Sequence, residues 1–300
     1  MGATAAVLDP EAVRFESASD SLREGYPGGD VFEWIALAIT ELGEDPAIIL
    51  ILAVLFWLVD RENVAMVAAV VATGAGFMLL LKTGFAIPRP PEAVWLVARD
   101  YDPYGVPSGH AFNAVILYGG LLYVWDRWRE PRWAVGGLAL IVGISVSRIV
   151  LGFHYLGDIV AGVLVGIVFL WLLDVITARD PFRCFTVGFL FAILAVLLSD
   201  DVIGLIALGA CVGGMIGTYR LDEIPDVDSQ SRFEAAVLTV GGLAFLVAVV
   251  LVQSTVAPES DVAIVLAHTA IIAGVLLGPF ASRELDALRV DRTGGGEPTA

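Results

Sequence analysis

The sequence predicts an all-α protein, a polytopic bundle of about nine helices that cross a membrane. Hydrophobic residues make up 58% of the 300 residues, and they gather in uncharged runs that approach or reach the roughly 20 residues needed to cross hydrocarbon. The net charge of −16 lies in the termini and in the loops, outside these runs. Most loops are short, which favours antiparallel packing of neighbouring helices.

The predicted elements follow one another with few interruptions. Residues 31–42 carry apolar side chains at helical spacing, which indicates an amphipathic interfacial helix or an extension of the following run. The apolar runs that predict spanning helices are 46–59, 63–81, 111–125, 133–151, 159–176, 184–199, 202–218, 235–252 and 262–281. We divide the chain into an acidic N-terminal segment (1–30), a core (31–177), additional transmembrane helices (178–282) and a flexible tail (283–300).

The charge balance narrows the class of protein. Sixteen arginines against one lysine, with so much acid, are typical of a halophile-like acidic proteome, although an acidic protein of a GC-rich genome has the same balance. The acidity argues against nucleic acid as a partner. Cys184 and Cys211 lie in separate apolar runs and indicate neither a disulfide framework nor a metal site. His268 stands alone in a late run, and we interpret it as structural.

Positive charge predicts the orientation in a cell membrane. One set of loops contains most of the arginines, and this set is predicted to be cytoplasmic together with the C-terminus: Arg61, Arg127, Arg129, Arg132, Arg179, Arg183, Arg220, Arg232, Arg283, Arg289 and Arg292. The opposite loops hold few cations, and these lie mainly in the motifs described next. The motifs are therefore expected on the extracytoplasmic face.

The first motif joins Lys82, at the end of an apolar run, to Arg89 in the loop that follows. Gly84 and Pro88 are expected to end the helix between them, so both cations can reach one anion. Arginine offers a planar fork to two phosphate oxygens, and lysine offers a point charge. Taken alone, such a pair is also typical of side chains that reach toward lipid headgroups.

The second motif is Pro107-Ser108-Gly109-His110, directly before an apolar run. The free N–H groups of a helix start bind anions, glycine permits close approach, and the Ser108 hydroxyl is a further donor. His110 would stand beside such an anion, able to protonate a leaving oxygen. The same four residues are also compatible with an ordinary helix N-cap followed by a histidine at the membrane interface, with no bound anion.

The third motif contains Arg148, His154 and Asp158. The histidine and the aspartate are four residues apart and are expected on one helical face, where the carboxylate can orient the imidazole. The other ring nitrogen would then be free to attack phosphorus. A structural ion pair at a helix start is the simpler interpretation of any two of these residues.

The three motifs together, in this order and spacing, resemble the type-2 phosphatidic acid phosphatase superfamily, which includes glucose-6-phosphatase-like enzymes and vanadium haloperoxidases. The resemblance covers roughly residues 31–177 and implies a six-helix-like phosphatase core. It implies that Lys82, Arg89, Ser108, Gly109 and Arg148 hold the phosphate. It also implies a phosphohistidine at His154, oriented by Asp158, with His110 as general acid. It implies no metal and no cofactor.

The function expected from the resemblance is that of an integral membrane phosphatase for a lipid phosphate or an isoprenoid (pyro)phosphate. One alternative is a lipid phosphotransferase, in which an alcohol takes the phosphoryl group from His154. Another is a non-catalytic lipid-binding or transport protein. The intact histidines argue against this last class, because binding needs only the cations, while the four late runs keep it from being dismissed. The sequence leaves the substrate and the oligomeric state open.

Overall fold

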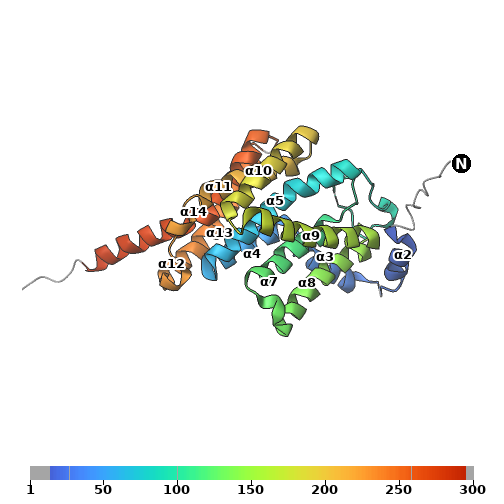
Figure 1. Cartoon of the computed structure of the whole chain (residues 1–300), viewed down its shortest axis with the longest axis horizontal. Helices are drawn as coiled ribbons and strands as arrows, with labels where there is room; N and C mark the ends of the chain where they lie inside the picture. The colour runs from blue at the N-terminus through green and yellow to red at the C-terminus, as the bar shows by residue number, and fades with distance from the viewer. Residues whose placement is uncertain (1–13, 27, 100, 258, 295–300) are drawn as a thin grey trace, which may run out of the picture. The chain divides into compact units, whose positions relative to one another are not determined.

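The computed structural model describes residues 14–26, 28–99, 101–257 and 259–294, and in these residues it contains helices and no β-strand (Figure 1). The predicted all-α polytopic fold is confirmed. The α-helices are α2 (Glu16–Glu24), α3 (Asp30–Glu41), α4 (Asp45–Leu58), α5 (Arg61–Phe85), α6 (Gly109–Ala114), α7 (Gly120–Val124), α8 (Pro131–Val150), α9 (Leu156–Thr177), α10 (Pro181–Leu198), α11 (Val202–Thr218), α12 (Arg232–Ala236), α13 (Gly242–Val256) and α14 (Asp261–Gly294). One π-helical segment, Val115–Gly119, joins α6 to α7, and another, Val237–Gly241, joins α12 to α13.

Each of the nine apolar runs forms a helix, and the chain is a multi-pass membrane protein. Among the described residues, six helices are long and apolar enough to cross a membrane, or seven if Val202–Thr218 and the bent segment after it form one span. These six are Arg61–Phe85, Pro131–Val150, Leu156–Thr177, Pro181–Leu198, Arg232–Val256 and Asp261–Arg289. The apolar helices Asp45–Leu58 and Gly109–Val124 are shorter.

The chain forms two compact units. One comprises Met1–Ile48 with Leu80–Leu172, and the other comprises Ile49–Leu79 with Leu173–Ala300. In the first unit α8 packs against α3 and α6. Its buried side chains include Phe112, Ile149, Leu151 and Phe153. All three motifs belong to this unit.

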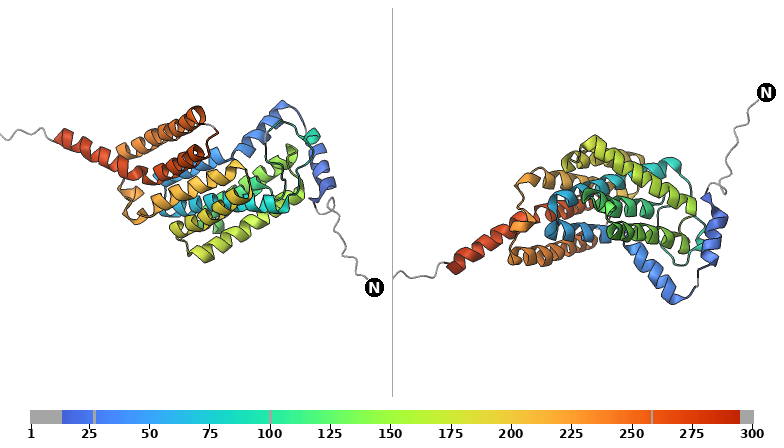
Figure 2. Two further views of the ribbon diagram at one scale, coloured as in Figure 1. Left: turned by 90° about the horizontal axis from the view of Figure 1, so that it is seen from above. Right: turned by 60° about the horizontal axis from the view of Figure 1, so that its bottom comes forward.

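In the second unit α11 packs against α10 on one side and α14 on the other (Figure 2). Glycines permit the close approach of α11 and α14: a Cβ atom at Gly209 or Gly213 would lie 2.4 Å from a carbonyl oxygen of α14. The Thr269 hydroxyl donates a hydrogen bond to the Gly209 carbonyl across this contact, at 3.1 Å. Small residues at four-residue spacing commonly bring membrane helices together in this way.

The predicted division into four parts stays a prediction. The interfacial segment 31–42 corresponds to α3, whose Val31, Trp34 and Ile35 side chains are exposed. The helix α14 continues to Gly294, within the segment predicted as a flexible tail. Residues 1–13 of the acidic segment and residues 295–300 of the tail lie outside the described residues.

Candidate functional site

The structure brings the residues of the three motifs together at one end of the helices of the first unit. Lys82 lies in the last turn of α5, Arg89 in the following loop, and Arg148 in the last turn of α8. Ser108 is the N-cap of α6 and is followed by Gly109 and His110, while Asp158 lies in the first turn of α9. The backbone links two motifs directly, because the Ser108 N–H donates to the Asp158 carbonyl at 3.0 Å.

Lys82 and Arg89 converge on one anion, as their spacing predicts. The helix α5 ends at Phe85, and the loop after it folds back so that the Arg89 N–H donates to the Pro103 carbonyl. The anion is the carboxylate of Asp102: its Oδ2 lies 2.7 Å from Nζ of Lys82 and 2.8 Å from Nη2 of Arg89. Sequence reasoning did not identify Asp102, which carries no motif signal.

The imidazole of His154 is almost fully buried, with 1% of its surface exposed. Its Nε2 lies 2.8 Å from Nη1 of Arg89. Since a guanidinium only donates, Nε2 accepts this bond and the ring proton of a neutral imidazole is on Nδ1. That Nδ1 faces Oδ2 of Asp158 at 3.5 Å and has no hydrogen-bond partner among the described residues.

The pairing of His154 with Asp158 differs from the predicted one. The helix α9 begins at Leu156, so the expectation that both residues lie on one helical face is wrong: His154 precedes the helix. The histidine is held instead by a turn in which its N–H and that of Phe153 donate to the Arg148 carbonyl. The separation of 3.5 Å exceeds that of a strong hydrogen bond.

The carboxylate of Asp158 is held by Arg14, which lies just before α2. Nε of Arg14 donates to Oδ1 at 3.0 Å, and Nη2 donates to Oδ2 at 2.9 Å. The guanidinium also stacks on the ring of Tyr155, 4.5 Å from its centre. On α2, the buried Ser19 hydroxyl accepts a bond from the Leu156 N–H at 2.8 Å. Sequence reasoning missed Arg14 because 144 residues separate it from its partner.

Arg148 is fully buried and only partly satisfied. Nη1 donates to the Thr40 hydroxyl at 3.1 Å and to the Tyr101 hydroxyl at 3.0 Å. The guanidinium stacks on the rings of Tyr101 and Phe153. Its Nε and Nη2 have no partner among the described residues. Because an unpaired buried charge is costly, these two nitrogens are available to donate to an anion.

His110 is paired with Glu44, which precedes α4. Nε2 of His110 lies 3.0 Å from Oε1 of Glu44, and the Tyr101 hydroxyl donates to the same oxygen at 3.2 Å. Burial raises the pKa of Glu44, but the contact with His110 and the charge of Arg148 lower it more, to about 2. Burial and the charge of Arg148 lower the pKa of His110 to about 4, against the opposite effect of Glu44. In the substrate-free site at neutral pH, Glu44 is ionised and His110 is neutral.

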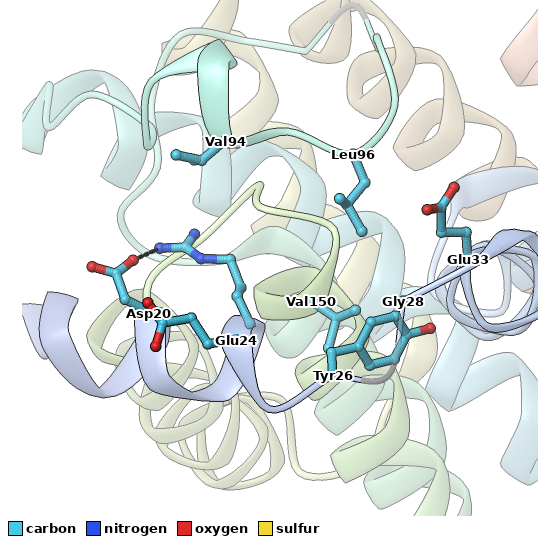
Figure 3. Close-up of a pocket in the computed structure, with 9 residues that line it drawn as sticks. Asp20, Glu24, Tyr26, Gly28, Glu33, Val94, Leu96 and Val150 are labelled. Atoms are coloured by element: carbon cyan, nitrogen blue, oxygen red, sulfur yellow. Dashed lines mark hydrogen bonds and ion pairs between the residues drawn. The ribbon is translucent and has the colours of Figure 1, made fainter.

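A groove of about 420 Å³ lies elsewhere in this unit, between α2, α3 and the loop after α5 (Figure 3). It is lined by apolar and acidic side chains, and none of the motif residues contributes to it. Its one cationic lining residue, Arg23, forms an ion pair with Asp20. The groove therefore does not fit an anion. Among the described residues no cluster of histidine, cysteine and carboxylate side chains fits a metal ion.

Comparison with known families identifies one matching segment. Residues 63–181 match the family model of the PAP2 superfamily, which confirms the resemblance to type-2 phosphatidic acid phosphatases. The chain matches no curated protein and no solved structure. The matched segment contains all the motif residues and leaves out Arg14 and Glu44.

The contact between Arg14 and Asp158 predicts a large effect on stability. Arg14→Met leaves a fully buried carboxylate without its cation, so we expect the Tm of the purified protein in micelles to fall by about 5 °C or more. In a protein that already carries Asp158→Asn, the same substitution should cost much less. The control is Arg23→Met, in the last turn of α2, because Asp20 is exposed and a surface pair contributes little. Equal effects of Arg14→Met and Arg23→Met would contradict the assignment.

Proposed function

We propose, from the PAP2 superfamily segment at residues 63–181, that this chain is an integral membrane phosphatase for a lipid phosphate or an isoprenoid (pyro)phosphate. The observation that carries the proposal is the buried guanidinium of Arg148, whose Nε and Nη2 have no partner among the described residues. The rings of Tyr101 and Phe153 hold it in place. An oxyanion at this point would satisfy both nitrogens.

The phosphoryl group is transferred in two steps. In the first, Nε2 of His154 attacks phosphorus, the bond from phosphorus to the ester oxygen breaks, and His110 protonates the departing oxygen. In the second, His110 takes a proton from water, the water oxygen attacks phosphorus, and the bond to His154 breaks. Inorganic phosphate leaves, and both histidines return to their initial states.

The charged groups lower the barriers of both steps. Lys82, Arg89 and Arg148 face the charge that develops on the phosphoryl oxygens, together with the N–H groups at the start of α6. A bound dianionic phosphate raises the pKa of His110, because nearby negative charge favours the imidazolium form. His110 then carries the proton that the leaving oxygen needs. Asp158 stabilises the Nδ1 proton of His154 while the phosphohistidine forms.

A lipid substrate fits the location of the site at helix ends. The helix α8 carries Arg148 in its last turn, and Arg127, Arg129 and Arg132 lie at or just before its start. At about 1.5 Å per residue, a 20-residue helix separates its two ends by about 30 Å, the thickness of the hydrocarbon layer. Since arginine-rich loops are cytoplasmic, we place the site at the extracytoplasmic face of the cell membrane. A phosphorylated headgroup can enter there while its apolar chain stays in the bilayer.

The two histidines should fail at different steps. His154→Ala should lower turnover by about a thousandfold or more and should form no phosphoenzyme. His110→Ala should still be phosphorylated by an aryl phosphate, whose leaving group needs little protonation. It should then accumulate an acid-labile, alkali-stable phosphoprotein, because water lacks its base.

The measurement is phosphate release together with ³²P labelling of purified protein in micelles, for phosphatidate, isoprenoid (pyro)phosphates and an aryl phosphate. His268→Ala is the control, since this histidine lies in α14 and its Nδ1 bonds only to its own helix, at the Ile264 carbonyl. It should keep the activity of the parent. Turnover by His154→Ala, or label on His110, would exclude the mechanism.

The orientation can be tested with single cysteines in a chain that carries Cys184→Ala and Cys211→Ala. Ala93→Cys, in the exposed loop after α5, should react with an impermeant thiol reagent on intact cells. Glu130→Cys, at the start of α8, should react only after the membrane is opened. The reverse labelling pattern would place the site in the cytoplasm.

A further inference from the structure

We propose that Asp102 is an internal competitor for the phosphate site, and that it makes the site selective for anions of charge −2. The proposal rests on the proposed function and deepens it by naming the residue that sets the charge threshold. A phosphate monoester or the terminal phosphate of a pyrophosphate would meet this threshold. A phosphodiester, with charge −1, would not.

The carboxylate of Asp102 occupies the position between the two cations of the first motif. Its Oδ2 contacts both Lys82 and Arg89, at 2.7 and 2.8 Å. Its Oδ1 accepts a bond from the Tyr104 N–H at 3.0 Å, and its carbonyl accepts one from Nε of Arg89 at 2.7 Å. Burial raises the pKa of Asp102, but Lys82 and Arg89 lower it more, so the group is ionised at neutral pH.

Arg89 cannot offer a parallel pair of N–H groups to a phosphate in this arrangement without a change of partners. Nε and Nη2 donate to Asp102, and Nη1 contacts Nε2 of His154 and the Phe153 carbonyl. Four of the five N–H groups are therefore engaged, which leaves one N–H of Nη2 and no parallel pair. A phosphate oxygen gains the fork of Arg89 only by replacing the carboxylate, because two anions at one pair of cations repel each other.

The exchange depends on the charge of the incoming group. A phosphodiester replaces one negative charge by another, so it gains no net attraction to Lys82 and Arg89. A dianion doubles the charge facing the same cations, in a buried environment where the interaction is strong. Attack by His154 further requires that Nη1 of Arg89 leave Nε2, a contact separate from those with Asp102.

A structural role for Asp102 predicts the opposite result. If its carboxylate only anchors Lys82 and Arg89 in place, its loss would let the cations move apart, and every anion would bind more weakly. Substitution of Asp102 therefore distinguishes a competitor from an anchor by the direction of the change in affinity. Asp102→Asn suits this test because the amide oxygen can still accept the bond from the Tyr104 N–H.

The experiment measures binding of inorganic phosphate and of dimethyl phosphate, a monoanionic diester, to the purified full-length protein in micelles. At pH 8, where phosphate is mostly dianionic, Asp102→Asn should bind phosphate about tenfold more tightly than the parent. The gain in affinity for dimethyl phosphate should be larger than the gain for phosphate. The preference of the site for phosphate over dimethyl phosphate should therefore be smaller in the variant than in the parent. The control Glu92→Gln, an exposed carboxylate in the same loop, should match the parent. Asp102→Ser, which also removes the charge, replaces the asparagine variant if that variant does not fold.

Two outcomes would overturn the proposal in different ways. If the parent binds phosphate and the Asp102 variant binds it equally or more weakly, Asp102 is an anchor, and the proposed function is unaffected. If neither protein binds phosphate, the proposed phosphatase function fails, and the role of Asp102 fails with it.

Discussion

The buried guanidinium of Arg148 is the constraint on which the first unit depends. Removing such a charge from water costs several kcal/mol unless partners compensate for it. Here α3 supplies the Thr40 hydroxyl, the loop after α5 supplies Tyr101, and the turn before α9 supplies the ring of Phe153. Glu44 adds a nearby negative charge. Segments distant in sequence are thus held at one point, yet two nitrogens have no partner among the described residues, and we propose that they bind an anion.

The other charged motif residues have partners from outside the motifs. Asp102 lies between the two cations of the first motif, Glu44 contacts His110, and Arg14 holds Asp158. Each pair reduces the cost of burying its charge in the substrate-free protein. Each pair also has to yield or adjust when a phosphate arrives, because the phosphate brings its own charge to the same cations. Under the proposed function, these extra residues therefore control how readily the site accepts a phosphate.

The sequence predicts the helices well, because these depend on local signals. Apolar runs predict the helices, and the break expected from Gly84 and Pro88 is seen where α5 ends at Phe85. The partners of the motif residues could not be predicted, since no periodicity links Arg14 to Asp158 across 144 positions. The spacing of His154 and Asp158 was misleading for a local reason: the turn before α9, and not a helix, sets the histidine's position.

In the proposed phosphatase, Arg148, Arg89 and Lys82 surround one oxyanion beside Nε2 of His154. An experimental structure of the full chain with vanadate, which mimics the five-coordinate transition state, tests it most directly. The account predicts vanadium bonded to Nε2 of His154, with Nε and Nη2 of Arg148 donating to vanadate oxygens. Vanadate bound at another place, or a site in which both nitrogens of Arg148 remain unpartnered, would contradict it.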